Sequence, residues 1–179
     1  MTEPARKLSM DELNRDSLEE FKQKPKTPLV LVLDNVRSLN NVGSAFRTGD
    51  AFAVEKIYLC GITGTPPNKE ITKTALGATE SVDWEHAKHT AELLKKLKAE
   101  NYKILAVEQV TNSVSLKEFQ PVLEQKYALV FGNEVFGVEE AALVLADTVL
   151  EIPQYGTKHS LNISVALGIV VWDLLAKLQ

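Results

Sequence analysis

Residues 152–175 read IPQYGTKHSLNISVALGIVVWDLL, and this stretch joins a strand end to an almost wholly apolar segment of helical length. Between them lie a turn built on Gly156 and a polar step at Ser160, Leu161 and Asn162. Polar residues therefore stand directly beside a core helix, which predicts a ligand site at this junction. The structural alternative is that Ser160 is simply the N-cap of the final helix.

Apolar runs of strand length occur along the whole chain, and the first of them, LVLVL, is apolar at every position. A continuous run of this kind is typical of a strand buried on both faces of a parallel sheet. The runs lie at 29–33, 57–60, 103–107, 127–131 and 148–152. Helical patterns alternate with them, and this alternation predicts an α/β fold with a mainly parallel sheet and flanking helices.

The helical patterns differ in clarity. One begins at Val42 with Asn40 or Asn41 as its expected N-cap. Its apolar face comprises Val42, Ala45, Phe46, Gly49 and Ala53. A second amphipathic helix is predicted over 91–100, with three leucines facing inward and three lysines mostly outward. Shorter helices are expected near 115–119 and 138–145, whereas the pattern over 74–84 is ambiguous.

Length and composition favour one domain, at 29–179, preceded by an N-terminal arm at 1–28. The chain has 179 residues and is 45% hydrophobic, enough for a sizeable core. The arm mixes acidic and basic residues, and Ser9 followed by Glu12 predicts a capping box that opens a helix over 9–22. Such an arm is either a solvated segment or a segment that contacts RNA or braces a dimer.

The same features bound the location and the chemistry. No long apolar run or secretory signal is present, so we expect a soluble, cytoplasmic protein with no membrane contact. The single cysteine, Cys60, is expected to be a small buried residue in a reducing compartment. The net charge of −4 argues against a chain that coats nucleic acid through global positive charge.

Standard nucleotide, metal and hydrolase motifs are absent from the sequence. There is no G-x-G-x-x-G or Walker A loop after the first strand, and no H-E-x-x-H, paired C-x-x-C or G-x-S-x-G. His86 and His89 are three residues apart but lack further ligands, so both are predicted to lie on the surface and no metal is expected. Polar residues at strand-to-helix junctions remain as the candidate site.

Two of these junctions contain charged residues beside glycine. At the first, Arg47 is expected to lean over Gly43 and Ser44, where the missing side chain of Gly43 leaves room for it or for a ligand. Its structural alternative is an ion pair with Asp50. At the second junction, FGNEVFG at 131–137, two glycines bracket one acidic residue, which suits close approach of a ligand to the backbone. A tight turn with the glutamate as a solvated cap is the alternative.

Three stretches in this order resemble the motifs of the SPOUT superfamily, specifically the SpoU/TrmH group of RNA ribose 2′-O-methyltransferases. They are NNVGSAFRTGDAF at 40–52, FGNEVFG at 131–137 and IPQYGTKHSLNISVA at 152–166. The resemblance covers about residues 29–179. It implies a SPOUT-type fold with a C-terminal trefoil knot, a homodimer, an RNA substrate and S-adenosylmethionine as the cofactor.

The resemblance also implies roles for particular residues. The catalytic or substrate-positioning residues would be Asn41, Arg47, Glu134, Ser160 and Asn162. The cofactor-binding residues would be Val107, Glu108, Gly132, Asn133, Ile152, Gln154 and Leu161. The chain departs from the family pattern at Val135 and Phe136, where small residues are common, and at Gln154, where methionine is common.

The resemblance thus predicts an S-adenosylmethionine-dependent methyltransferase that acts on a ribose 2′-hydroxyl. Transfer RNA is favoured over ribosomal RNA because the chain is small and shows no separate RNA-binding domain. Two alternatives stay open, namely a non-catalytic RNA-binding or assembly factor that retains the fold, and an RNA base methyltransferase of the same superfamily.

Overall fold

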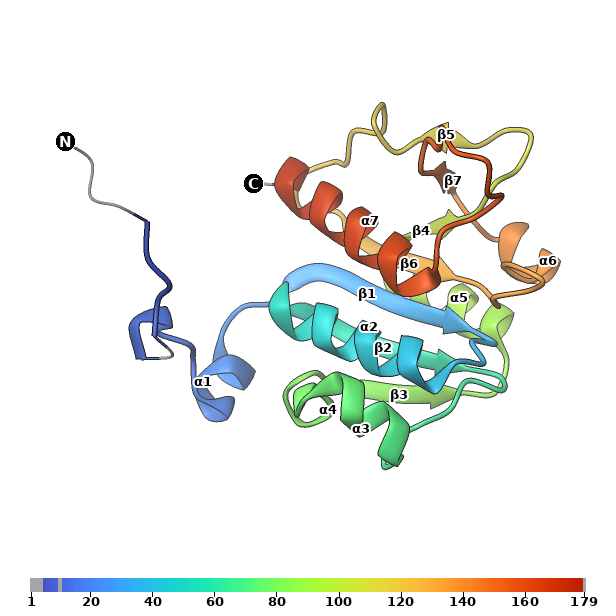
Figure 1. Ribbon diagram of the computed structural model, residues 1–179. Helices are drawn as coiled ribbons and strands as arrows, with labels where there is room; N and C mark the ends of the chain where they lie inside the picture. Colours follow the sequence, from blue (N-terminus) through green and yellow to red (C-terminus); the bar gives the residue numbers. More distant parts are fainter. Residues whose placement is uncertain (1–4, 10, 179) are drawn as a thin grey trace.

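The computed structural model describes residues 5–9 and 11–178, and in it one seven-stranded parallel sheet organises the chain (Figure 1). The strand order is β3-β2-β1-β6-β4-β7-β5. The strands are β1 (Thr27–Asp34), β2 (Val54–Cys60), β3 (Trp84–Ala87), β4 (Tyr102–Val107), β5 (Val114–Ser115), β6 (Lys126–Phe131) and β7 (Thr148–Glu151). The predicted α/β class and parallel sheet are confirmed, because every strand pair is parallel.

Helices lie around this sheet and, apart from the one in the N-terminal arm, pack on its two faces. They are α1 (Leu18–Gln23), α2 (Leu39–Ala51), α3 (Lys69–Ala75), α4 (Ala78–Ser81), α5 (Thr90–Ala99), α6 (Glu140–Leu143) and α7 (Ile163–Leu178). Central strand β1 sends Leu29, Leu31 and Leu33 into a core shared with α2, α3 and α7. Val30 and Val32 face the opposite core, which α5 and α6 cover. The LVLVL run is therefore buried on both faces, as predicted.

Helix α2 begins earlier than predicted. Ser38 is the N-cap, and its Oγ accepts a hydrogen bond from the backbone N–H of Asn41 at 3.3 Å. Asn40 and Asn41 are already helical, so the prediction that one of them caps the helix is wrong. The predicted apolar face is buried except at Ala53, which lies beyond the end of the helix.

Three other expectations change in the structure. The helix expected near 115–119 is absent, because Leu116 donates to the Glu151 carbonyl at 2.8 Å and extends the pairing of β5 with β7. The helix expected over 138–145 shrinks to the four residues of α6. The ambiguous stretch 74–84 contains the end of α3, all of α4 and the first residue of β3. The helix predicted at 91–100 is confirmed as α5, and its three leucines are buried.

The N-terminal arm extends away from the sheet (Figure 1). The single helix predicted over 9–22 is wrong for the described part, which has a short 3-10 turn, η1 (Asp11–Leu13), and then α1 with Ser17 as its cap. Residues 1–4 and 10 lie outside the described residues. The division into an arm at 1–28 and a domain at 29–179 stays a prediction.

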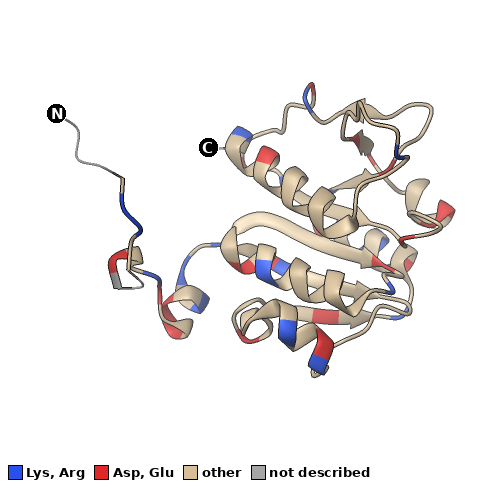
Figure 2. Ribbon diagram, in the orientation of Figure 1, with Lys and Arg blue, Asp and Glu red and all other residues tan. Residues whose placement is uncertain are grey.

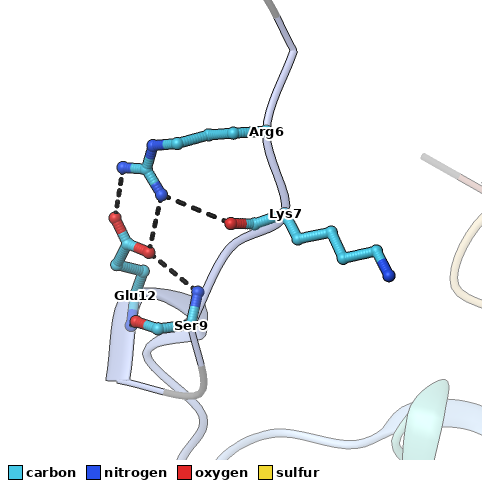
Figure 3. A network of polar contacts seen from close by, with 4 residues as sticks. All are labelled: Arg6, Lys7, Ser9 and Glu12. Carbon is cyan, nitrogen blue, oxygen red and sulfur yellow. Dashed lines mark hydrogen bonds and ion pairs between the residues drawn. The ribbon is translucent and has the colours of Figure 1, made fainter.

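The capping box predicted at Ser9 forms, although a 3-10 turn follows it. Ser9 N–H donates to Glu12 Oε2 at 2.8 Å, and Glu12 N–H donates to Ser9 Oγ at 3.3 Å. Arg6 also pairs with the Glu12 carboxylate at 2.6 Å (Figure 3). This hydrogen bond, with those from Ser9, lowers the pKa of Glu12 to about 2. Acidic and basic residues are interspersed along the arm and across the domain (Figure 2).

The C-terminal strand lies inside a loop of the chain. Strands β4 and β6 are neighbours, yet residues 108–125 that join them pass out to β5, on the far side of β7. This connection therefore passes β7 on its way out to β5 and again on its way back to β6. After β7 the chain continues into α7 on the face of the sheet that carries α2. The SPOUT-type knot expected from the resemblance requires such an enclosed final strand.

Two further expectations concern exposure. Cys60 is fully buried at the end of β2, as predicted, and its burial raises the pKa of the thiol to about 12. Within the described ranges 5–9 and 11–178, no helix is both long and apolar enough to cross a membrane.

Candidate active site

A pocket of about 380 Å³ opens at the carboxyl ends of β4, β6 and β7, where the first turn of α7 closes it. Ligands bind at this edge in open α/β sheets. Its wall is formed by Val107, Glu108, Gln109, Phe131, Gly132, Asn133, Glu134, Val135, Gly137, Leu150, Glu151, Ile152, Gln154, Ser160, Leu161, Asn162, Ile163 and Ala166. All seven predicted cofactor-binding residues lie in it, with three of the five predicted catalytic ones.

The loop between β6 and α6 forms one side of the pocket as a closed turn. The backbone groups of Asn133 and Gly137 bond to each other in both directions at 2.9 Å. Asn133 Oδ1 accepts hydrogen bonds from the N–H groups of Val135 and Phe136 at 2.8 and 3.1 Å. Asn133 Nδ2 donates to the Asn35 carbonyl at 2.8 Å and joins this turn to the end of β1.

The glycines of this loop allow close packing of the chain against itself. A Cβ on Gly132 would stand 2.1 Å from the backbone of Gly137 and Val138, and one on Gly137 would stand 2.1 Å from Glu108 Oε2. Gly137 also has φ +70°, which favours glycine. Gly132 does line the pocket, but the space beside its Cα is filled by the loop itself.

Glu134 connects this loop to the start of α2. Its carboxylate accepts hydrogen bonds from the backbone N–H groups of Arg37 and Ser38 and from Asn41 Nδ2, each at 3.0 Å. Partial burial would raise the pKa of Glu134, but these hydrogen bonds outweigh it and hold the pKa below its usual range. Glu134 is thus an ionised cap for a helix N-terminus as well as a pocket residue, and Asn41 reaches the pocket only through it.

Arg47 lies outside the pocket, on the surface of α2. It lines a separate groove of about 470 Å³ with Ser44, Lys73 and Phe52 among its neighbours. The space beside Gly43 holds no ligand, because a Cβ there would stand 1.9 Å from Thr74 Oγ1 and 2.4 Å from a carbonyl of α3. The interpretation of Gly43 as room for Arg47 or a ligand is therefore wrong.

The alternative partner of Arg47 is also absent. Asp50 accepts a hydrogen bond from Ser81 Oγ instead. Among residues 5–9 and 11–178 the structure shows no hydrogen bond or ion pair to the Arg47 guanidinium, which is exposed. Arg47 is therefore free to bind a group from outside its own chain.

The segment between β7 and α7 forms the opposite side of the pocket. Helix α7 starts at Ile163, and Asn162 Oδ1 accepts hydrogen bonds from Ser164 N–H at 2.8 Å and Ser164 Oγ at 2.6 Å. Asn162 is thus the N-cap, and the alternative that assigned this part to Ser160 is wrong. Ser160 is exposed at the pocket wall.

Sequence reasoning missed several residues of the wall. Gln109 and Glu151 stand at or just after strand ends, a position that could have identified them. Ala166 carries no polar group, so only the fold reveals that its small side chain leaves space at the first turn of α7. The wall contains three glutamates and neither lysine nor arginine, which suits a ligand with positive charge.

No metal centre accompanies the pocket. In the described part of the chain, no group of three or more His, Cys, Asp or Glu side chains could hold a metal ion. His86 and His89 are both exposed, as predicted. His86 Nε2 lies 3.0 Å from the Gly61 carbonyl, which accounts for its orientation.

A parallel sheet with an enclosed C-terminal strand and a pocket built from three loops defines the SpoU class of α/β proteins. The model of the SpoU rRNA Methylase family matches residues 28–172, and the chain belongs to this family.

Individual relatives agree with this membership. The chain is 28% identical to the 23S rRNA (guanosine-2′-O-)-methyltransferase RlmB of Vibrio vulnificus, over 94% of this chain and 67% of that protein. The TrmH/SpoU tRNA-modifying enzyme of A. aeolicus shares 29% identity with a TM-score of 0.79, over 89% of this chain and 80% of that one.

A third relative has its cofactor in place. An rRNA methyltransferase from Sinorhizobium meliloti, solved with AdoMet bound, shares 25% identity with a TM-score of 0.79. The match covers 90% of this chain and 60% of that chain. The chain thus spans about two thirds of the curated relative and somewhat less of the AdoMet-bound one.

Proposed function

We propose that the chain is an S-adenosylmethionine-dependent RNA methyltransferase that acts on a ribose 2′-hydroxyl. The observation that supports this proposal most is the convergence of residues from two distant motifs on one pocket. The loop at 131–137 and the segment at 152–162 form opposite sides of it, at the strand ends where a ligand is expected. Family membership and the activities named for the relatives agree with it.

The pocket fits the cofactor in size and in charge. Its volume of about 380 Å³ lies in the range for small-molecule and cofactor sites. Glu108, Glu134 and Glu151 line it without a neighbouring lysine or arginine, which suits a sulfonium cation. Val107, Gly132, Ile152 and Leu161 would hold the nucleoside part through backbone and apolar contacts.

When bound, S-adenosylmethionine supplies an activated methyl group. The residues of the chain would position the ribose and manage charge. Glu134 and Asn41 fix the β6–α6 loop against α2, and this contact keeps the wall of the pocket in place. Ser160 and Asn162 line the pocket and are exposed, so the ribose would enter beside them. Arg47 would bind the neighbouring phosphate and stabilise the negative charge that develops on the ribose oxygen, whose proton would pass to solvent water because a protonated guanidinium cannot accept it.

Arg47 does not line the pocket of its own chain, and this position supports a homodimer in which it serves the pocket of the partner. An exposed apolar row on α7 contains Val165, Ile169 and Trp172. Trp172 contacts Phe52, which lines the Arg47 groove, with ring centroids 5.8 Å apart. The other end of α7 closes the pocket. A two-fold axis that pairs α7 with its copy in antiparallel orientation would carry each Arg47 toward the partner's pocket.

A binding and turnover experiment tests the proposed activity. Calorimetry with S-adenosylmethionine should show binding by the wild type and by Arg47→Ala, because Arg47 lies outside the pocket. Methyl transfer to unmodified RNA should fall by at least about 100-fold in the variant, as expected for loss of one transition-state contact. Substantial turnover by Arg47→Ala would refute its role, and absence of cofactor binding by the wild type would favour a non-catalytic RNA-binding factor.

Mixing two inactive variants tests the dimer. If each pocket takes Arg47 from the partner, then Arg47→Ala mixed with a pocket variant such as Glu134→Ala forms some dimers with one intact site. Activity should return to about a quarter of the wild-type value when the copies exchange at random. Sedimentation should give a monomer for Trp172→Glu, and no recovery from the mixture would assign Arg47 to its own pocket.

For the class of RNA that serves as the substrate, we favour transfer RNA over ribosomal RNA. The relatives include both, an RlmB that acts on 23S rRNA and a TrmH/SpoU enzyme that modifies tRNA. Mapping the 2′-O-methyl positions that disappear in a deletion strain would decide between them. Digestion to nucleosides would separate ribose methylation from base methylation, since only the ribose product resists alkaline cleavage at the modified site.

A further inference from the structure

Two aromatic side chains beside the pocket are almost fully exposed. Phe136 is 85% exposed on the β6–α6 loop, and Tyr155 is 96% exposed on the segment between β7 and α7. Their chain neighbours Val135 and Gln154 both line the pocket, so the two rings stand on the two loops that border it. Aromatic rings gain much from burial, yet neither ring is used in the core.

The loop presents Phe136 on a backbone that is already fixed. Its tip is closed by the mutual hydrogen bonds of Asn133 and Gly137, and the N–H of Phe136 itself donates to Asn133 Oδ1. Glu134 anchors the same tip to the start of α2. A ring on such a backbone loses little conformational entropy when it binds a partner.

The segment that carries Tyr155 differs in charge from the pocket. Residues 153–162 read PQYGTKHSLN and include Lys158 and His159, both exposed, with no acidic residue. The pocket wall, by contrast, holds glutamates and no lysine or arginine. An aromatic ring with a lysine on the same segment is a combination that binds single-stranded nucleic acid, because the base stacks on the ring and the phosphate attracts the cation.

We propose that Phe136 and Tyr155 form a stacking site for an unpaired nucleobase of the RNA substrate, next to the nucleotide whose ribose is methylated. This inference rests on the proposed function and adds a subsite at the mouth of its pocket. Every base has a π-face, so the rings hold the strand without selecting its sequence. RNA loops, whose bases are splayed out, fit such a site better than a duplex.

The test compares Phe136→Ala, Tyr155→Ala and the double variant with Leu123→Ala. Leu123 is also an exposed apolar residue, at 64%, but it precedes β6 at the opposite end of that strand from the pocket. The probe is a short single-stranded oligoribonucleotide that carries 2-aminopurine, whose fluorescence falls when the base stacks. Each single variant should bind it about tenfold more weakly, and the double variant weaker still.

Turnover supplies the second measurement. The double variant should raise KM for unmodified RNA while kcat changes little, because the rings touch a base and not the reacting atoms. Phe136→Tyr and Tyr155→Phe should keep most of the wild-type affinity, since both rings still stack. Leu123→Ala should match the wild type in both measurements.

The two proposals fail in different ways. If the wild type neither binds S-adenosylmethionine nor transfers a methyl group, the proposed function is wrong, while quenching of the probe still tests the stacking site. If the wild type transfers methyl and the double variant binds the probe as tightly as the wild type, the stacking site is overturned. An equal loss of affinity in Leu123→Ala would overturn it too, because the effect would not depend on the pocket mouth.

Discussion

Asp34 and Glu134 are carboxylates at the same edge of the sheet, yet one closes the structure and the other opens onto the pocket. Asp34 is the last residue of β1, Glu134 follows β6, and these two strands are neighbours in the sheet. Asp34 is fully buried and accepts hydrogen bonds from the Thr90 hydroxyl, from Asn35 Nδ2 at 3.0 Å and from Glu139 N–H at 2.8 Å. Glu134 also accepts three, but it is exposed.

The difference shows that hydrogen-bond number alone does not tell a buried structural carboxylate from one that faces a pocket. The donors to Asp34 come from the starts of α5 and α6 as well as from its neighbour, so Asp34 ties together elements that cover one face of the sheet. Because Asp34 is fully buried, water could not accept these hydrogen bonds in its place. At the exposed position of Glu134, by contrast, water could accept the same hydrogen bonds if the carboxylate were removed. The carboxylate also lies at the pocket wall, where its charge is available to a ligand.

Removal of Asp34 should give the largest effect on stability. Asp34→Ala leaves the Thr90 hydroxyl and the Glu139 N–H without an acceptor in a buried setting, which costs about 3–5 kcal/mol. Thermal unfolding should then show a midpoint lower by roughly 10 °C. Asp34→Asn keeps one acceptor oxygen and should lose about half as much. A midpoint within 2 °C or so of the wild type for Asp34→Ala would show that this junction rearranges at little cost.

The sequence predicted the strand before Asp34 but not the function of the residue. The run at 29–33 is long, apolar and β-branched, so local pattern suffices. The burial of Asp34 depends on Thr90 and Glu139, which are 56 and 105 residues away in the chain. Strands β3 and β5 were missed for a related reason, because a four-residue edge strand and a two-residue strand carry too little pattern to stand out.

Removal of Glu134 should separate stability from function. Glu134→Ala deprives the start of α2 of its acceptor, and loss of such a cap costs about 1 kcal/mol. Methyl transfer should fall much further, by at least about tenfold, because the pocket wall loses its anchor to α2. Thermal unfolding and single-turnover methyl transfer measure the two effects. If activity falls only in proportion to the folded fraction, Glu134 is structural like Asp34.

The parts of the candidate site that follow directly after strands could be predicted from the sequence. The parts that are set by packing between distant elements could not. The residues at 107–108, 132–134, 152, 154 and 160–162 line the pocket because the ends of parallel strands meet at one edge. The location of Arg47 could not be derived, since α3 fills the space beside Gly43 and no local pattern reveals that contact. The N-caps of α2 and α7 were likewise assigned to the wrong residues, because the cap is set by the backbone geometry at the start of each helix. The structure has Ser38 and Asn162 in these positions.

Asn41 should have a smaller effect that depends on Glu134. Asn41→Ala removes one of three donors to the carboxylate and should destabilise the protein by about 0.5 kcal/mol. The double variant with Glu134→Ala should lose less than the sum of the two single variants, because they share one interaction. Urea unfolding of all four proteins gives this coupling. Strict additivity would mean that the Asn41–Glu134 contact contributes nothing in solution.

The smallest expected effect is the pH dependence of stability that Glu134 contributes. Its pKa is lowered in the folded protein, so its contribution is complete above the pKa of about 4.3 that an unfolded chain has and is lost as pH falls through the folded value. Wild type should therefore be more stable than Glu134→Gln at pH 7, and this difference should shrink as pH falls below about 4.

The carboxylate of Asp147, whose pKa is also lowered but which lies far from the pocket, serves as the control. The difference in stability between wild type and Asp147→Asn should also shrink in this pH range, but the affinity for the cofactor should not change. Glu134→Gln, by contrast, should weaken cofactor binding at pH 7. A constant difference between wild type and Glu134→Gln from pH 7 to pH 3 would show that the carboxylate charge does not stabilise the start of α2.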